Sequence, residues 1–410
     1  MKFRDYQEKI IGQGSVILEK YGLLYLSMEV RTGKTLTSFG VCEELGAKRV
    51  LFLTKKKAIS SIEDDYKMMD PSFELQVINY ESAHKVNLGF SPDVVIADES
   101  HSLGAFPKPS SRAKRLKADI KTWKSKLILM SGTPTPESFS QIYHQVYGCL
   151  TNPFVEYTNF YKWANKFVNK KQIHYGIRVA TDYSFAHENM VIEAMKPYTI
   201  SFTQKEAGFK SVIDEEILIV DMEDRTTELC ERLKKDRVLQ GSDEVVLADT
   251  GVKLLQKLHQ ICSGTVIFES KKSVVLDYSK AKYIKNKFKG NKIGIFYKFT
   301  AELKALKEIY GDDLTTELEE FNTTDKNIAL QIVSGREGIS LKEAKYLVYY
   351  NIDFSATSYW QSRDRMTTKE RMHNKIYWIF SKNGIEKKIY QAVNNKKDYT
   401  LKHFKRDYVI

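Results

Sequence analysis

Short apolar runs that alternate with helical stretches constrain the fold of this 410-residue chain more than any other feature. In the first third, runs of six or seven residues rich in Val, Ile and Leu lie at 22–28, 49–54, 75–80, 93–98 and 126–132. Continuous apolar runs of this length are typical of strands buried on both faces. Helical spacing separates them, for example over 35–45 and 58–69. This alternation predicts an α/β fold with a parallel sheet and right-handed crossovers.

A second set of the same type lies toward the C-terminal end. Further strands are expected at 215–222, 292–297, 327–334 and 346–351. The middle of the chain does not show this alternation. Aromatic residues are frequent at 152–168, and apolar residues at helical spacing cover 250–264, where Gly264 is the expected cap. No Pro- or Gly-rich linker marks a boundary, which we place near 225–275. The predicted divisions are a first lobe at 1–150, a mostly helical insertion and linker at 151–250, and a second lobe at 251–410.

The stretch SMEVRTGKT at 27–35 follows the first predicted strand and precedes a helical stretch. A phosphate-binding loop requires this context, since backbone N–H groups at a helix N-terminus bind phosphate oxygens. The residues of the predicted loop are Arg31, Thr32, Gly33, Lys34 and Thr35. Lys34 would reach the β- and γ-phosphates, and the Thr35 hydroxyl would ligate Mg²⁺. The usual spacing has glycine where this chain has Met28, so the loop alone leaves a chance Gly-Lys-Thr as an alternative.

An Asp-Glu pair supplies the second half of the predicted site. Asp98 and Glu99 stand at the C-terminal end of the strand expected at 93–98. Ligands of open α/β sheets bind at that edge, where an acidic residue can hold Mg²⁺ directly or through water. A second carboxylate beside it can orient and deprotonate the attacking water. Following a phosphate loop, the pair is interpreted as metal-binding Asp98 and catalytic base Glu99 rather than as a solvated strand end.

These motifs resemble those of the superfamily-two helicases and translocases. The sequence DESH at 98–101 is similar to the Asp-Glu-x-His box of that superfamily. The loop at 27–35 resembles the phosphate loop of the Swi/Snf-like branch, which also lacks the first glycine, although Arg31 stands where that branch has glycine. The resemblance implies two RecA-like lobes with ATP and Mg²⁺ in the cleft between them. The compact size resembles versions encoded by bacteriophages.

Further segments resemble motifs of the same family, in the family's order, across nearly the whole chain and least clearly over 151–250. The resemblance implies nucleotide contacts by Gln7, which would bind adenine, and by Gly338. It implies nucleic-acid contacts by Lys55, Lys56, Lys57 and Tyr80. It implies coupling of the ATP state to domain closure by His101, Ser131, Thr133 and Gln361.

The last motif departs from the family pattern. When Gln361 is aligned with the family's glutamine, Arg365 falls on the first arginine, which we expect to contact ATP. The second arginine, the finger that stabilises charge on the γ-phosphate, falls on Thr368. Arg363 and Arg371 stay open as substitutes. The departure also leaves open a weakly active ATPase or one completed by a protein partner.

The net charge of the chain indicates what kind of partner it binds. A charge of +12 and a pI near 9.1 favour a polyanion such as nucleic acid. No run of eighteen apolar residues occurs, so no membrane span is expected, and the first ten residues lack the apolar core of a secretory signal. The four widely spaced cysteines are typical of buried thiols in a reducing compartment rather than of a zinc site. We therefore expect a cytoplasmic location, that of a bacterial host if the chain is phage-encoded.

The predicted function is ATP hydrolysis coupled to movement on DNA. Duplex DNA is favoured, with single-stranded DNA as the other track, because the resemblance is to a branch that typically translocates on duplex DNA without full strand separation. One alternative is a strand-separating or branch-migrating helicase of replication or recombination, which is disfavoured because no long hairpin for prying strands apart is evident. The others are a DNA clamp or inhibitor with a vestigial ATPase and the motor subunit of a restriction or defence complex.

Overall fold

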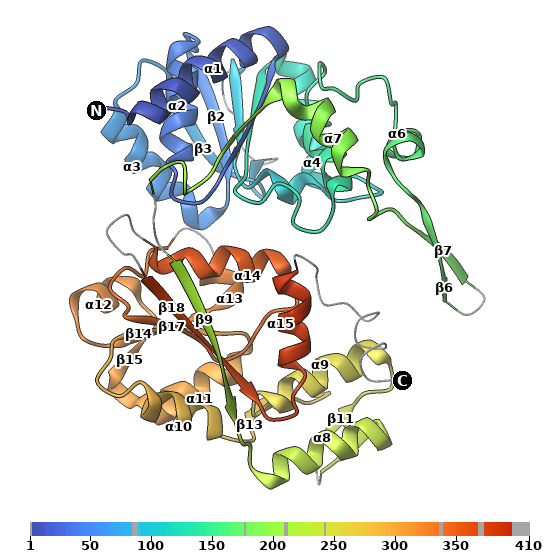
Figure 1. Ribbon diagram of the computed structural model, residues 1–410, viewed down its shortest axis with the longest axis vertical. Coiled ribbons are helices and arrows are strands. Elements are labelled where there is room, and N and C mark those ends of the chain that lie inside the picture. The colour runs from blue at the N-terminus through green and yellow to red at the C-terminus, as the bar shows by residue number, and fades with distance from the viewer. Residues whose placement is uncertain are drawn as a thin grey trace. The chain divides into compact units, whose positions relative to one another are not determined.

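The computed structural model describes residues 2–83, 89, 91–175, 178–208, 212–241, 243–335, 339–367 and 373–395. The chain divides into two compact units, Met1–Phe209 and Lys210–Ile410, each built on its own six-stranded sheet (Figure 1). All strand pairs within these two sheets are parallel. The predicted α/β class with parallel sheets is confirmed.

The first sheet has the strand order β3-β2-β4-β5-β1-β8. Its strands are β1 Leu23–Met28, β2 Arg49–Thr54, β3 Glu74–Asn79, β4 Val94–Ala97, β5 Lys126–Met130 and β8 Thr199–Phe202. The first five coincide with the apolar runs predicted as strands. The sixth, β8, pairs with β1 from Tyr25↔Thr199 to Met28↔Phe202 and was not expected from the sequence.

Helices cover both faces of this sheet, as the continuous apolar character of its strands requires. In β1, Leu24 and Leu26 pack on the side of α1, α2 and α3, while Leu23 and Tyr25 pack on the side of α4 to α7. The helices are α1 Asp5–Tyr21, α2 Lys34–Glu44, α3 Ile59–Met69, α4 Ser111–Trp123, α5 Ile142–Val146, α6 Phe160–Phe167 and α7 Glu188–Met195. The side chains at positions 23–26 of β1 are almost fully buried, and each contributes about 1.5–3 kcal/mol of hydrophobic stabilisation.

The stretch 151–250 is divided between the two units instead of forming a mostly helical insertion. Its first part belongs to the first unit and includes β6 Lys171–Tyr175 and β7 Arg178–Asp182, an antiparallel hairpin that the sequence analysis did not foresee. Its strands are only five residues long and lack the continuous apolar run by which the buried strands were predicted. The strand expected at 215–222 is longer, β9 Val212–Val220, and it belongs to the second sheet. The change of unit therefore lies at 209/210, earlier than the expected boundary near 225–275.

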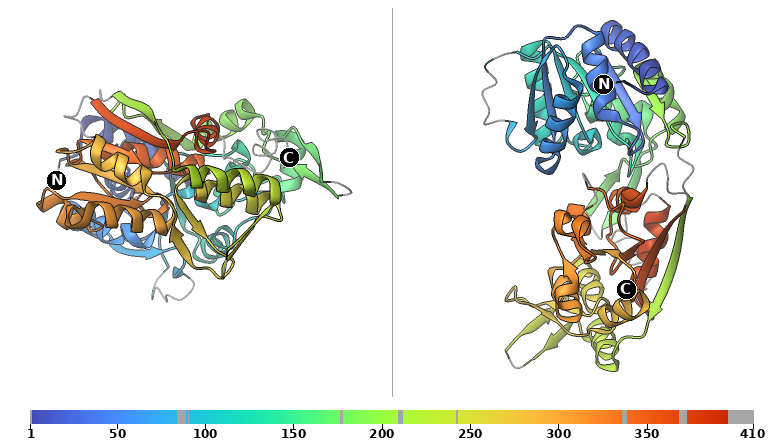
Figure 2. Two further views of the ribbon diagram at one scale, coloured as in Figure 1. Left: turned by 90° about the horizontal axis from the view of Figure 1, so that it is seen from below. Right: turned by 90° about the vertical axis from the view of Figure 1, so that its left-hand side faces the viewer.

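The second sheet has the order β15-β16-β14-β17-β18-β9, with β9 at one edge (Figure 2, right). Its further strands are β14 Ile293–Tyr297, β15 Leu314–Thr315, β16 Asn327–Gln331, β17 Tyr346–Tyr349 and β18 His373–Ser381. Two small hairpins join β10 Val238–Gln240 to β11 Val245–Leu247 and β12 Thr265–Ile267 to β13 Ser273–Val275. The helices are α8 Asp224–Asp236, α9 Gly251–Cys262, α10 Ser279–Lys287, α11 Thr300–Tyr310, α12 Leu318–Thr323, α13 Ile332–Gly335, α14 Ala356–Arg363 and α15 Glu386–Asn394.

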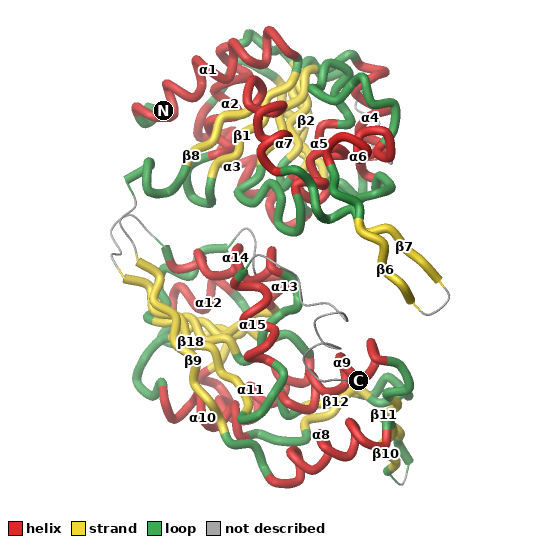
Figure 3. The backbone as a smooth tube through the Cα atoms, turned by 45° about the vertical axis from the view of Figure 1, so that its right-hand side comes forward, coloured by secondary structure: helices red, strands yellow, loops and turns green. Residues whose placement is uncertain are grey.

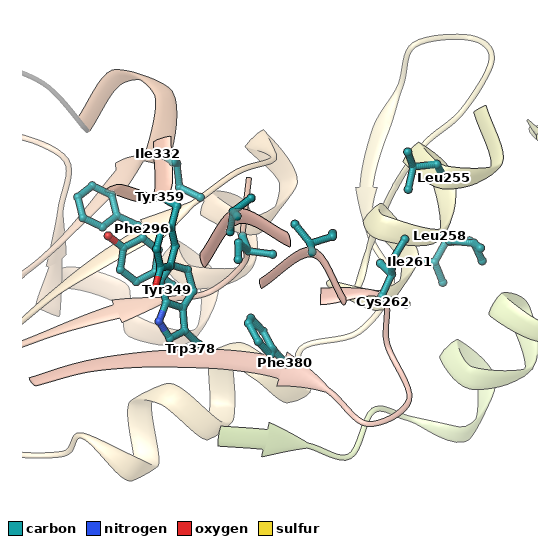
Figure 4. Packing of buried hydrophobic residues seen from close by; sticks show 14 of the residues in the cluster. Leu255, Leu258, Ile261, Cys262, Phe296, Ile332, Tyr349, Tyr359, Trp378 and Phe380 are labelled. Atoms are coloured by element: carbon teal, nitrogen blue, oxygen red, sulfur yellow. The ribbon is translucent and has the colours of Figure 1, made fainter. Parts of the chain in front are cut away.

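Aromatic side chains form much of the core of the second unit. Figure 4 shows Phe296, Tyr349 and Trp378, from three neighbouring strands, packed on the face that α9 also covers. The rings of Tyr349 and Trp378 are stacked with their centres 3.9 Å apart. The expected cap Gly264 follows α9 with a left-handed φ of 80°. Within the described ranges, the helices are all too short or too polar to cross a membrane.

Candidate nucleotide-binding site

Three predicted motifs meet at one edge of the first sheet. β5 lies between β4 and β1, and all three strands are parallel, so their C-terminal ends come together. The segments that leave these ends are the loop at 29–33, the Asp-Glu box at 98–101 and the stretch that begins at Ser131. This is the edge at which open α/β sheets bind ligands.

The predicted phosphate loop has two residues with a left-handed backbone. Gly33 has a φ of 81° directly before α2, a conformation that favours glycine, and a Cβ atom at this position would lie 2.6 Å from Nε2 of Gln7, whose side chain would have to shift. Arg31 also has a left-handed backbone, with a φ of 64°. Glycine adopts this conformation without strain, so Arg31 carries a backbone cost that glycine would not have.

Hydrogen bonds within the loop hold its shape. The carbonyl oxygen of Glu29 accepts from Thr32 Oγ1 at 2.7 Å and from Lys34 Nζ at 3.2 Å. Gln204, which follows β8, supports the loop from outside, because its backbone N–H donates to Glu29 Oε2 at 2.7 Å and its amide donates to Val30 O at 2.9 Å. With Lys34 and Thr35 as its first residues, α2 directs its N-terminal N–H groups toward the space beyond the loop.

Gln7, the residue expected to bind adenine, contacts the phosphate loop itself. Its side chain is buried, and its amide nitrogen lies 3.3 Å from both Gly33 O and Thr37 Oγ1. Neighbouring Tyr6 donates its hydroxyl to Thr32 O at 3.1 Å. The start of α1 is thus attached to the loop, and adenine binding by Gln7 stays a prediction.

Asp98 is held in place by two hydrogen bonds, one to its side chain and one to its backbone. Its Oδ2 accepts a hydrogen bond from Thr54 Oγ1 at 2.9 Å, and its carbonyl oxygen accepts one from the Tyr80 hydroxyl at 2.6 Å. Burial and the neighbouring charge of Glu99 raise the pKa of Asp98 to about 6, while the Lys34 ammonium and the Thr54 hydroxyl oppose that rise. Lys34 at the start of α2 and Asp98 after the end of β4 thus belong to segments at the same edge of the sheet.

Glu99, His101, Ser131 and Thr133 form a connected group beside Asp98. His101 Nδ1 lies 3.2 Å from Glu99 Oε2 and 3.1 Å from Ser131 Oγ. Ser131 Oγ in turn accepts the backbone N–H of Thr133 at 3.1 Å. Glu99 has a left-handed φ of 47°, a strained backbone of the kind that gathers at functional sites. The residues predicted for catalysis and for coupling are thus in contact.

The residues present fit Mg²⁺ bound together with a nucleotide. Among the described residues, no group of three or more His, Cys, Asp and Glu could hold a metal by itself. Mg²⁺ in nucleotide sites typically uses one or two protein ligands, with phosphate and water oxygens for the rest. The Asp98 carboxylate and the Thr35 hydroxyl are ligands of this kind. Thr133 Oγ1, buried and without a hydrogen-bond partner within the described ranges, is a further polar atom that a bound ligand can satisfy.

The predicted nucleic-acid contacts are placed differently from one another. Lys55, Lys56 and Lys57 follow β2 at the same edge of the sheet, and the latter two are exposed. Tyr80 is only 8 % exposed, and its hydroxyl is bonded to the backbone of Asp98. The Tyr80 hydroxyl thus helps to fix the backbone at Asp98, and its contact with nucleic acid stays a prediction.

The predicted arginines of the second unit have defined partners where they are described. Arg363 forms an ion pair with Glu215, whose carboxylate also accepts from Trp378 Nε1 at 2.8 Å. Arg365 donates to the carbonyl oxygen of Ile339 at 3.3 Å. Gly338, Thr368 and Arg371 lie outside the described residues, and of Gln361 only the backbone, in α14, is described.

Two supporting residues were missed by the sequence analysis. Thr54, like Asp98, is a polar residue at the end of an apolar run. That position could have identified it as a residue at the ligand-binding edge of the sheet. Gln204 gave no such signal, because it reaches the loop from a segment 175 residues farther along the chain.

Comparison with known proteins gives matches only among solved structures. No protein-family model matches the sequence, and no curated protein matches it. The Sulfolobus solfataricus SWI2/SNF2 ATPase core in complex with dsDNA is similar at 13 % identity and a TM-score of 0.43, over 96 % of this chain and 91 % of that one. The Sulfolobus solfataricus SWI2/SNF2 ATPase core domain is similar at 15 % identity and a TM-score of 0.42, over 97 % and 89 %.

Proposed function

We propose that this protein hydrolyses ATP with Mg²⁺ and uses the reaction to move on DNA. The observation that carries the nucleotide part is the convergence of two separate motifs, the loop that leads to Lys34 and the strand end with Asp98 and Glu99, at the ligand-binding edge of the first sheet. A lysine for phosphate beside a carboxylate for Mg²⁺ is the charge arrangement that nucleoside triphosphates require. The family resemblance of the motifs supports the same proposal.

The side chains of the site have distinct roles in this proposal. Lys34 and the N–H groups at the start of α2 bind phosphate oxygens, and Asp98 with Thr35 hold Mg²⁺, which neutralises phosphate charge when bound. Glu99 accepts a proton from the attacking water. His101 positions the Glu99 carboxylate, because its Nδ1 lies between that carboxylate and Ser131.

An arginine of the second unit is proposed to stabilise the charge that develops on the γ-phosphate. Arg365 is the favoured residue. Arg363 is the less suitable candidate, because its guanidinium is engaged with Glu215 in the second unit's own core. Gly338, Gln361 and Arg371 keep the roles that the resemblance implies.

DNA is the proposed track because of the chain's charge and the position of its basic residues. The net charge is +12, and Lys55, Lys56 and Lys57 lie at the same sheet edge as the nucleotide site. Such lysines bind phosphates without reading bases, so we expect affinity that falls with salt and shows little sequence preference. Duplex DNA is favoured by the resemblance to the Swi/Snf-like branch.

The β6–β7 hairpin favours a second candidate, a strand-separating helicase. That alternative was disfavoured because no long hairpin is evident in the sequence, and the first unit has a hairpin whose two strands are five residues each. Replacing 172–181 with Asn-Gly would remove most of it, since Lys171 and Asp182 are paired in the ladder and a two-residue turn can join them. If the wild type unwinds a forked duplex and the variant without the hairpin does not, the helicase is favoured. If neither the wild type nor the variant unwinds it, the translocase is favoured.

Two variants test the nucleotide site. Lys34→Ala should abolish ATP turnover, whereas Lys48→Ala, which changes an exposed lysine before β2, should not. Glu99→Gln should still bind ATP, measured by equilibrium binding of a fluorescent ATP analogue, but should not hydrolyse it. Full hydrolysis by Lys34→Ala would overturn the site, and undiminished hydrolysis by Glu99→Gln would remove that residue as the base.

A further inference from the structure

The part of the first unit between α5 and β8 carries a surface that the nucleotide site does not use. After α6, strands β6 and β7 form a two-stranded sheet of their own. Figures 1 and 3 show this hairpin extending away from the six-stranded sheet and the helices of its unit. Its exposed position makes it available to a partner, and its side chains indicate the chemistry of that partner.

Helix α6 fixes one side of this surface to the core. Phe160, Trp163, Ala164 and Phe167 are all buried, at the spacing of a single helix face. Trp163 and Phe167 stack with their ring centres 5.2 Å apart. The helix therefore has a fixed orientation, and its other face is directed outward.

That outward face of α6 is basic, and two more exposed lysines follow the helix up to the first residue of β6. We call it the lysine face and define it by Lys162, Lys166, Lys170 and Lys171, all of which are exposed. Within the described residues, none of these four ammonium groups forms an ion pair with a carboxylate. Between 151 and 187 the sequence has five Lys and Arg residues but only two acidic ones. Tyr161, 45 % exposed, adds an aromatic ring to the same helix.

The base of the hairpin is bonded to the chain that leaves the nucleotide site. Ser138 Oγ donates to Ser184 O at 2.6 Å, and Ser140 Oγ donates to Tyr183 O at 2.5 Å. Both serines are buried, and they follow the Ser131–Thr133 stretch by a few residues. One end of the element is thereby tied to the segment that contacts His101.

The other end of the element is tied to the phosphate loop. After α7 the chain enters β8, and the carbonyl oxygen of Phe202 accepts the backbone N–H of Glu29 at 3.0 Å. Gln204 then bonds both Glu29 and Val30, as described above. The segment from Ser138 to Gln204 thus begins and ends on parts of the nucleotide site.

We propose that the lysine face is a second contact surface for duplex DNA, and that its occupancy raises the rate of ATP hydrolysis. This inference rests on the proposed function. A duplex carries one negative charge per about 1.7 Å of its axis, so a row of exposed lysines meets several phosphates at once. The attachment of the element to the loop and to the Ser131 stretch gives DNA bound there a direct structural path to the nucleotide site.

The experiment replaces all four lysines of the lysine face with alanine. The matched control replaces Lys9, Lys20, Lys48 and Lys121, which are exposed elsewhere on the same unit and remove the same charge. ATP hydrolysis is measured against duplex concentration at several salt concentrations. For the lysine-face variant we expect half-maximal stimulation to need at least about tenfold more duplex, and the slope of log affinity against log salt to fall by about two to four.

Basal hydrolysis without DNA should be unchanged in both variants, and the control should keep a nearly wild-type salt slope. Equal circular dichroism and melting temperature establish that both are folded. The inference is overturned if the lysine-face variant behaves as the control does while the wild type is stimulated by duplex. If the wild type hydrolyses ATP but neither binds nor responds to duplex, the proposed DNA motor fails and the inference fails with it.

Discussion

The hydrogen bond from Thr54 to Asp98 offers a sharp test of the metal-binding carboxylate. Thr54 is 1 % exposed, and its hydroxyl lies 2.9 Å from Asp98 Oδ2. Thr54→Val keeps the branched shape but removes the only group of that side chain able to donate. The ionised form of Asp98 loses most, because a donor stabilises a carboxylate more than a carboxylic acid.

The magnitude follows from the environment of Asp98. A hydrogen bond to a charged group contributes about 1.5–3 kcal/mol, and a pKa unit corresponds to about 1.4 kcal/mol. The pKa of Asp98, already raised to about 6 by burial and by Glu99, should therefore rise further by about one unit or more. A carboxyl whose folded pKa exceeds its unfolded value of 3.8 favours the folded state at low pH, and this contribution is lost as pH rises through the folded pKa. The variant should thus lose more stability at pH 8 than at pH 4.

The assay is the pH dependence of kcat/KM for ATP hydrolysis, which reports ionisations of the free enzyme. Since Mg²⁺ needs ionised Asp98, the acidic limb of the wild type should fall near pH 6, and that of Thr54→Val should move up by about one pH unit. Thr122→Val, in which the lost hydroxyl bonds Ala118 O on the exposed side of α4, is the control and should not move it. If the acidic limb does not shift and the rate falls equally at every pH, Thr54 does not control the ionisation of Asp98 that hydrolysis needs.

Further substitutions separate strain, packing and coupling. Arg31→Gly should relieve a left-handed backbone and raise the melting temperature of the first unit by about 1–3 °C, read by calorimetry; a fall would show that the side chain's contacts outweigh the strain. Arg363→Ala should destabilise the second unit by about 3 kcal/mol in denaturant unfolding, since it leaves Glu215 without its ion-pair partner, and a neutral effect would count against that pair. Arg365→Ala should leave stability nearly unchanged and slow hydrolysis at least tenfold; a normal rate would remove it as the arginine of the site. His101→Ala should lower DNA-stimulated hydrolysis more than basal hydrolysis, and equal losses would argue against coupling through it.

The sequence predicts the central strands because their residues are apolar on both faces. The strands β1, β2, β4 and β5 all lie where the apolar runs placed them, and the two loops at their C-terminal ends follow from parallel topology alone. The edge strand β8 was missed, because its four residues give too short a run to recognise, whereas the edge strands β3 and β9 were expected. Since β9 belongs to the second sheet, the boundary between the units lies before it.

The site residues fall into two groups, those within local motifs and those that reach the site from distant segments. Lys34, Asp98, Glu99 and His101 belong to local motifs that directly follow predicted strands, so the sequence is enough to place them at the C-terminal edge of the first sheet. Contacts made by distant segments are invisible to motifs, and Gln204 on the loop is the clearest case. Tyr80 shows a further limit, because a motif position does not reveal that its ring is buried and its hydroxyl already bonded to Asp98.

The most direct test of the central claim is steady-state ATP hydrolysis by the purified chain, alone and with duplex DNA, single-stranded DNA and RNA at low salt. We expect Mg²⁺-dependent hydrolysis that duplex DNA stimulates most strongly and that Lys34→Ala abolishes. Stimulation mainly by single strands or forks would transfer the function to the helicase alternative. No hydrolysis with any nucleic acid, by a chain that binds duplex tightly, would contradict the claim and leave the clamp or a partner-completed ATPase.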